Sequence, residues 1–289
     1  MPPPAAVDPA TFDVDHAMFE VRSLVAIVPR DSGTPGAAKA AEHLKKRLEA
    51  VGVKADVETF ISKSPAGMTV FRNVVGKIPG TATGLVIMAS HYDTKSGIGD
   101  AFQGANDSGS SSGILLELAR VFAKGPKPGP ELRFVFFDGE ECMQSYGPND
   151  GLQGSRTYAT QLVNEGRKSD VWAVIVMDMV GDSHLSVTLP RNGTTELMVA
   201  VMNAAHAENA REKFSLHPFE VGDDHVSFLE RGMPAIDLID FDYGSAPGRN
   251  EYWHTLQDTI DKISPESLGI VGRVVIRVVN ETVAKKSAL

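Results

Sequence analysis

The chain has 289 residues, of which 42% are hydrophobic and 22% charged, a composition typical of a globular protein that is neither disordered nor membrane-embedded. Its formal net charge of -9 argues against a binder of nucleic acid or acidic membranes, because both functions need a concentrated positive surface. No apolar run is long enough to span a membrane, so small molecules or peptides are the favoured partners.

The opening segment, Met1 to Pro9, is proline-rich and lacks the basic start and apolar stretch of a signal peptide. We expect residues 1–14 to form a flexible N-terminal segment, of the kind that remains after a signal sequence is removed. A secreted or periplasmic location therefore stays open. The single cysteine, Cys142, excludes an intrachain disulfide and leaves the compartment unassigned.

Apolar residues recur at helical spacing over residues 15–28 and 37–51, and the second stretch stops before Gly52. Short runs rich in β-branched and aromatic residues then predict five buried strands: Val70 to Ile78, Leu85 to Ser90, Leu132 to Phe137, Val171 to Met177 and Ala235 to Ile239. Between and after them, helical stretches are predicted at Ser110 to Ala123, Ser155 to Asn164, Thr195 to Ala210 and Pro265 to Val283. This alternation predicts an α/β fold of three layers, α/β/α, with a central mixed, mostly parallel sheet. Residues 15–289 are expected to form one catalytic domain.

Ionisable residues follow several predicted strands, at the edge where open α/β sheets form their sites. His91-Tyr92-Asp93 ends the strand from Leu85, and we expect its imidazole and carboxylate on opposite sides of the strand tip. Such a pair often only anchors a loop. Asp107 follows within Gly104-Ala105-Asn106-Asp107-Ser108-Gly109, where the alternative is an N-cap for the next helix.

The sharpest motif is Asp138-Gly139-Glu140-Glu141, directly after the strand Leu132 to Phe137. Three carboxylates in four residues repel one another unless a cation is present. Adjacent glutamates suit a division of labour, in which one binds the cation and the other carries a proton. Asp178 ends a further strand, and His254 lies in Tyr252-Trp253-His254-Thr255. Together these segments supply the oxygen and nitrogen ligands that zinc binds in proteins.

The order and spacing of these motifs resemble the zinc exopeptidase family that contains the two-zinc bacterial leucyl aminopeptidases. Within that family the chain is similar to the animal-type glutaminyl cyclases, or glutaminyl-peptide cyclotransferases. The narrower resemblance rests on Phe136 to Glu141 followed by Pro148 to Arg156, on Trp253 before His254, on Asp223-Asp224-His225, and on Pro29 to Ala40 and Thr59 to Asn73. The chain departs from the animal cyclases at four positions: Tyr146 replaces a tryptophan, Asp237 a histidine, and Ser90 and Ser112 a cysteine pair that they can carry.

This resemblance implies the zinc exopeptidase, or phosphorylase/hydrolase-like, fold. It also implies one Zn²⁺, with peptide or protein N-termini as substrates, whose N-terminal glutamine becomes pyroglutamate as ammonia leaves. The implied roles are zinc ligation by Asp107, Glu141 and His254, acid/base catalysis by Glu140, a catalytic carboxylate network of Asp178 and Asp223, and a substrate-binding wall of Trp253 and Tyr146.

Two other hypotheses remain open. In an aminopeptidase that hydrolyses N-terminal residues from peptides, His91 and Asp178 would hold a second zinc, bridged through Asp107. A catalytically inactive binding module that kept the fold is the third possibility, and bound-metal analysis separates it from the enzymes. No nucleic-acid or membrane partner is expected, and the oligomeric state is left open.

Overall fold

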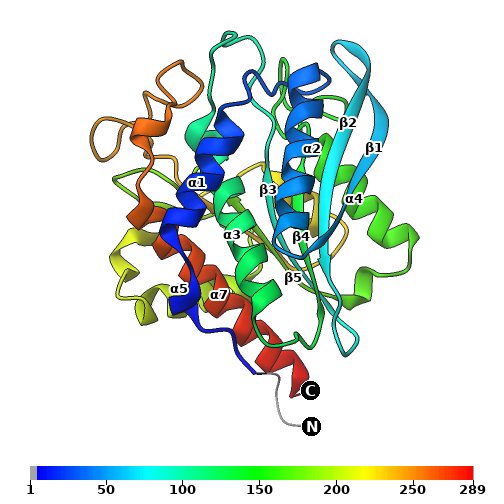
Figure 1. Cartoon of the computed structure of the whole chain (residues 1–289), viewed down its shortest axis with the longest axis vertical. Coiled ribbons are helices and arrows are strands. Elements are labelled where there is room, and N and C mark those ends of the chain that lie inside the picture. The colour runs from blue at the N-terminus through cyan, green and yellow to red at the C-terminus, as the bar shows by residue number, and fades with distance from the viewer. Residues whose placement is uncertain (1–4, 289) are drawn as a thin grey trace.

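An eight-stranded sheet forms the centre of the computed structural model, which describes residues 5–288 (Figure 1). Its strand order is β1-β2-β4-β3-β5-β8-β6-β7. The four inner strands β4, β3, β5 and β8 are parallel, β6 and β7 are also parallel, and the other three pairs are antiparallel. The strands are β1 Lys54–Ser64, β2 Gly67–Ile78, β3 Leu85–His91, β4 Glu131–Phe137, β5 Val171–Asp178, β6 Val187–Leu189, β7 Phe214–Leu216 and β8 Ala235–Ile239. The prediction of a mixed, mostly parallel sheet is confirmed.

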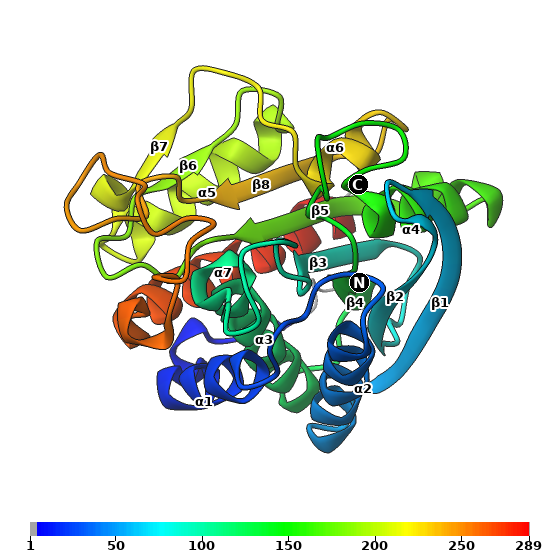
Figure 2. The same ribbon diagram turned by 90° about the horizontal axis from the view of Figure 1, so that it is seen from above.

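Helices cover both faces of this sheet, as Figure 2 shows from above. The α-helices are α1 Val14–Val25, α2 Pro35–Ala50, α3 Ser111–Lys124, α4 Gln153–Asn164, α5 Thr195–Ala207, α6 Asp224–Leu229 and α7 Pro265–Ser287. Val86 and Met88 of β3 point into the larger core, which α1, α2, α3, α5 and α7 share. Leu85 and Ile87 point the opposite way, toward α4 and α6, because side chains alternate along a strand. The three-layer prediction is therefore confirmed.

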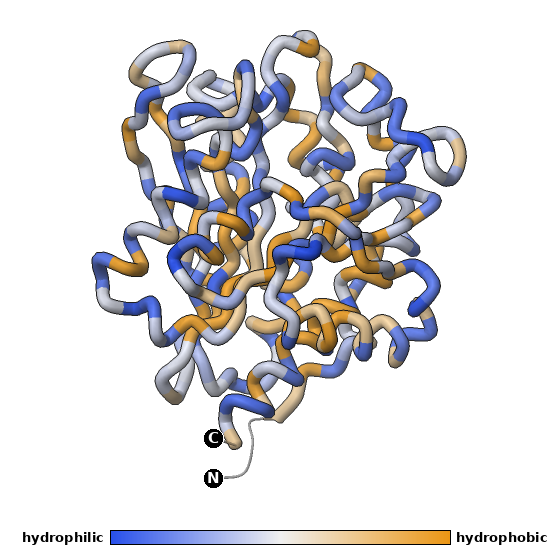
Figure 3. The backbone as a smooth tube through the Cα atoms, turned by 180° about the vertical axis from the view of Figure 1, so that it is seen from behind, coloured by the Kyte–Doolittle hydropathy of each residue, from blue (hydrophilic) through white to orange (hydrophobic). Residues whose placement is uncertain are grey.

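The central strands are buried on both faces, and Figure 3 shows hydrophobic residues gathered in the interior of the fold. All seven residues of β3 are buried. Edge strand β1, by contrast, has many exposed or half-buried side chains. The mostly apolar sequences of the inner strands are what a sheet covered on both sides requires.

Part of the predicted N-terminal segment packs against α7. Val7 and Phe12 are both buried, and the backbone N–H of Val7 donates to Oδ1 of Asn280 at 3.0 Å. Phe12 lies over Gly272 of α7, where a Cβ atom would come within 2.1 Å of the phenyl ring. Residues 1–4 lie outside the described part of the chain, and the boundary at residue 14 stays a prediction.

Ser90 and Ser112, which stand where the animal cyclases can carry a cysteine pair, face each other between β3 and α3. Their hydroxyl oxygens are 3.4 Å apart, and both hydroxyls also donate to the carbonyl of His91. The two serine hydroxyls thus join these elements through a shared acceptor, the carbonyl of His91. Within residues 5–288, no helix combines the length and the hydropathy needed to cross a bilayer.

Candidate metal centre

The carboxyl ends of three neighbouring parallel strands bring most of the predicted residues together. His91 ends β3, Glu140 and Glu141 follow β4, and Asp178 ends β5. Asp107 comes from the irregular segment before α3, and His254 from the loop between β8 and α7. All of these residues except His91 line a pocket with a volume of about 160 Å³. Its lining also includes Tyr146, Asp223, Phe241 and Trp253.

Asp107, Glu141 and His254 form the first candidate metal group. Nε2 of His254 lies 3.2 Å from Oδ2 of Asp107 and 3.0 Å from Oε1 of Glu141. Both carboxylates are buried. Within the described residues, Oε2 of Glu141 has no hydrogen-bond donor, and the nearest cation is Lys95 at 3.6 Å. Two buried carboxylates and one imidazole are a donor set that fits zinc, and the unpaired oxygen favours a cation at this point.

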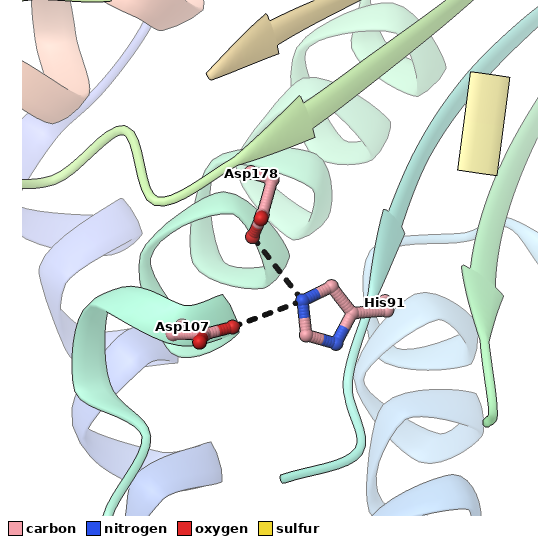
Figure 4. A group of neighbouring side chains, drawn as sticks. All are labelled: His91, Asp107 and Asp178. Carbon is pink, nitrogen blue, oxygen red and sulfur yellow. Dashed lines mark hydrogen bonds and ion pairs between the residues drawn. The ribbon is translucent and has the colours of Figure 1, made fainter. Parts of the chain in front are cut away.

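His91, Asp107 and Asp178 form the second candidate group, drawn in Figure 4. Nε2 of His91 is 3.2 Å from Oδ1 of Asp107 and 3.2 Å from Oδ1 of Asp178. The two carboxylate oxygens of Asp107 therefore face two different histidines. Asp107 is thus a member of both candidate groups.

Glu140 lies beside the metal groups without belonging to either. The hydroxyl of Tyr146 donates to its two carboxylate oxygens at 3.1 and 3.3 Å. Burial raises the pKa of Glu140 well above its ordinary value, and the neighbouring Asp223 raises it further. Because burial favours the protonated form of a carboxylate, Glu140 is suited to carry a proton.

The two predicted wall residues flank the same pocket. The indole of Trp253 stacks on the His254 ring, with ring centroids 4.0 Å apart, and is 39% exposed. Tyr146 is 51% exposed, although its hydroxyl reaches the buried Glu140. Both side chains thus line the pocket and keep an exposed surface that a substrate can contact.

Asp223 lies in a third group of potential ligands, with His225 and Asp237. All three side chains are buried, and only Asp223 lines the pocket. Nδ1 of His225 is 4.0 Å from Oδ2 of Asp237. Burial, followed by repulsion from Asp178, raises the pKa of Asp223 well above its ordinary value. The predicted carboxylate network thus has its members within electrostatic reach of one another.

Two expectations about orientation are wrong. Asp93 lies on the same side as His91, since its Oδ1 is 3.5 Å from Nδ1 of His91, as residues two apart in an extended chain do. Asp138 does not join the carboxylates of Glu140 and Glu141. It accepts from the hydroxyl of Ser32 at 2.7 Å and from the backbone N–H of Arg72 at 2.8 Å. Gly139, with φ 76°, turns the chain between Asp138 and the glutamates.

Two groups of supporting residues were not assigned a role from the sequence. The carboxylate of Asp93 accepts the backbone N–H groups of Glu140 and Glu141, each at 3.2 Å. Asp258 accepts from the backbone N–H of Asp107 at 3.2 Å and from the hydroxyl of Tyr243 at 2.6 Å. For Asp93, the sequence does contain a signal, because it lies two residues after His91, which ends β3. Asp258 lies in an irregular loop, where no periodicity indicates its partners.

Comparison with known proteins agrees with this geometry. The sequence model of peptidase family M28 matches residues 73–279. A glutaminyl-peptide cyclotransferase of Boiga irregularis is 26% identical in an alignment that covers 86% of this chain and 76% of the relative. A glutaminyl cyclase of an Acidobacteriales bacterium superposes with a TM-score of 0.87 at 32% identity, covering 98% of this chain and 97% of that one. A Zn-dependent exopeptidase from Parabacteroides distasonis gives a TM-score of 0.81 at 26% identity, covering 95% and 99%.

Proposed function

The chain belongs to peptidase family M28, and on that premise we propose that it is a zinc-dependent glutaminyl cyclase, which converts N-terminal glutamine into pyroglutamate and ammonia. Relatives that are named glutaminyl cyclases align along most of its length, and this supports the proposal. The main observation behind the proposal is that one candidate metal group and a buried glutamate line the same small pocket. That group is Asp107, Glu141 and His254, and the glutamate is Glu140.

The three ligands are proposed to hold one zinc ion. When bound, the ion would polarise the side-chain amide carbonyl of the substrate glutamine. The carboxylates of Asp107 and Glu141 are buried and lie close to His254, so the three ligands are already together in the pocket. Trp253 and Tyr146 would contact the carbon chain of the glutamine from the exposed side.

Glu140 is proposed as the proton carrier. The α-amine nitrogen of the substrate attacks the carbon of its side-chain amide, so a ring C–N bond forms while the bond to the amide nitrogen breaks. Glu140 accepts the proton that the amine loses and returns it to the departing nitrogen, which leaves as ammonia. The Tyr146 hydroxyl orients the carboxylate by donating to it. Because the nucleophile is part of the substrate, no activated water is required.

An aminopeptidase is the second candidate function, and the group of His91, Asp107 and Asp178 favours it. A second metal ion held there would share Asp107 with the first. Glu140 would then take the proton of a water molecule before that water attacks the first peptide bond. The same residues serve either reaction, so the number of bound ions separates the two.

The test couples two measurements on one purified sample. The cyclase proposal predicts about one zinc per chain by elemental analysis. It also predicts ammonia release from a glutaminyl peptide at a rate that exceeds leucyl-amide hydrolysis. Two zincs with dominant leucyl cleavage would select the aminopeptidase, and Asp223→Ser would then change little. A chain with neither zinc nor turnover would be an inactive binding module.

A further inference from the structure

His254 stands on a long connection that has little regular structure. Between β8 and α7, residues 240–264 contain only a short 3-10 helix, Ile260–Lys262. His254 itself adopts a left-handed backbone conformation, with φ 53°, which a non-glycine residue adopts only when its surroundings hold it there. Neighbouring contacts, rather than a helix or strand, must therefore place this ligand.

Asp258 supplies a contact that reaches from this connection to another ligand. One of its carboxylate oxygens accepts the N–H of Asn106 at 2.7 Å, and the other accepts the N–H of Asp107 at 3.2 Å. The hydroxyl of Tyr243 donates to the first oxygen at 2.6 Å. Asp258 is fully buried. A buried carboxylate with three donors is strongly held, because hydrogen bonds to a charged group are stronger than those between neutral groups.

The short path from His254 to Asp258 is also fixed. The N–H of Asp258 donates to the carbonyl of Thr255 at 3.0 Å, and the N–H of Thr255 donates to the carbonyl of Tyr252 at 3.2 Å. The Thr255 hydroxyl donates to the Tyr252 carbonyl as well, at 2.8 Å. Two consecutive turns thus connect the imidazole of His254 to the carboxylate that holds the backbone of Asp107.

A buried arginine provides the opposite charge. The guanidinium of Arg30 donates to the carbonyls of Tyr92, Gln103 and Gly104 at 2.9, 2.8 and 3.1 Å, so it fixes the chain directly before Asp107. Burial lowers the pKa of Arg30 to about 10, and Asp258 is the strongest of the charges that oppose this shift. The segment from Gln103 to Asp107 is therefore held by the side chains of both Arg30 and Asp258.

We propose that Asp258 is a positioning residue that sets the separation of Asp107 and His254 and so determines the zinc affinity of the centre. It is not itself a ligand in the candidate groups. Its carboxylate fixes the backbone of Asp107 from the connection that carries His254, so the two ligand atoms meet before the ion arrives. The proposal rests on the proposed zinc site of Asp107, Glu141 and His254, and it holds for a cyclase or an aminopeptidase.

The test replaces Asp258 by asparagine and compares it with a matched control, Asp240→Asn. Asp240 is also fully buried, and it accepts the N–H groups of Ser186 at 2.7 Å and Asp242 at 2.8 Å, neither of which belongs to a metal group. In Asp258→Asn an amide NH₂ replaces one acceptor oxygen, so one of the three donors loses its acceptor. Zinc Kd is measured by competition with a chromophoric chelator, and Tm is measured on the metal-free proteins.

We expect Asp258→Asn to raise the zinc Kd by about 10- to 100-fold, the usual effect of removing a group that orients metal ligands. Its kcat should recover toward the wild-type value when zinc is in excess. Asp240→Asn should lower Tm and leave the zinc Kd within about twofold of wild type, because its hydrogen bonds reach Ser186 and Asp242 and not Asp107 or the turns next to His254. Tyr243→Phe keeps the carboxylate and should raise Kd by a smaller factor, which provides the measurement if Asp258→Asn does not fold.

An unchanged zinc Kd in a folded Asp258→Asn, or an equal rise in Asp240→Asn, would overturn the proposal. An unchanged Kd in Tyr243→Phe would overturn it when Asp258→Asn is unfolded. A wild-type protein that binds no zinc would instead reject the metal site, and with it the proposed function. A wild type with one zinc and no cyclase activity would reject only the reaction, while the Kd comparison would still decide the role of Asp258.

Discussion

Glu140 and Glu141 are neighbours in the sequence that face different partners. Oε1 of Glu141 is 3.0 Å from Nε2 of His254, whereas the carboxylate of Glu140 accepts from the hydroxyl of Tyr146. The backbone N–H groups of both glutamates donate to the same carboxylate, that of Asp93. Asp93 therefore fixes the backbone from which one side chain reaches the metal group and the other reaches the substrate pocket.

The different partners of Glu140 and Glu141 predict different phenotypes for two matched substitutions. Glu140→Gln should keep its zinc and lose turnover by at least about 100-fold, the contribution of a positioned acid/base. Glu141→Gln should instead bind zinc more weakly. Elemental analysis and steady-state kinetics on both variants check the pair. A near wild-type rate in Glu140→Gln would remove its catalytic role, and exchanged phenotypes would reverse the assignment.

The burial of His225 predicts that the free energy of unfolding depends on pH. Burial lowers its pKa to about 4, whereas an unfolded histidine titrates near pH 6.5. Between these values the unfolded chain binds a proton that the folded chain rejects. The contribution of His225 to stability is therefore complete above pH 6.5 and is lost as pH falls toward 4.

The measurement is the free energy of unfolding of wild type and His225→Asn by chemical denaturation. From pH 7 to pH 4, the wild type should lose ~3 kcal/mol relative to the variant, because only the wild type takes up this proton on unfolding. Any packing cost of the substitution itself should be the same at both pH values. A difference between the two proteins that does not change with pH would show that His225 is not buried in its neutral form.

At the scale of elements, the sequence predicts the strands that are buried on both faces of the sheet. Strands β3, β4, β5 and β8 are mostly apolar, and the predicted bounds of Ala235–Ile239 are the observed ones. Strand β1 was missed because it lies at the sheet edge and many of its side chains are exposed. Strands β6 and β7 have three residues each, and α6 has six, too few for a period to show.

The contact between the N-terminal segment and α7 gives a prediction at this scale. A Cβ atom on Gly272 would lie 2.1 Å from Cε2 of Phe12. Gly272→Ala should therefore destabilise the protein, because the ring must move out of its buried position. In a Phe12→Ala background, the same Gly272→Ala change should be neutral or stabilising by up to about 1 kcal/mol, since alanine favours helices over glycine.

Thermal and denaturant unfolding of the four proteins in this double-mutant cycle would measure the coupling between the two positions. A reversal of sign between the two backgrounds would show that Phe12 stays packed on α7 in solution. Equal effects of Gly272→Ala in both backgrounds would mean that the segment before α1 does not hold this position.

At the scale of the whole molecule, the candidate centre depends on segments distant in the sequence. The ligand residues were recognisable because they follow strands whose carboxyl ends share one edge of the sheet, and because their motifs resemble a known family. The residues that position these ligands could not be recognised in this way. Asp258 and Tyr243 lie in an irregular connection, and their contacts with the Asp107 segment arise only when the chain is folded.

His254 and Asp258 follow Asp107 and Glu141 in the sequence, and this order has a consequence for biosynthesis. Asp107 and Glu141 leave the ribosome well before the imidazole that completes their group. After His254, the connection is anchored by the N–H of Ser264, which donates to the carbonyl of Gly181 at 2.9 Å, and then continues into α7. A nascent chain therefore presents an incomplete donor set until His254 has been synthesised, and we expect metal capture to follow that point.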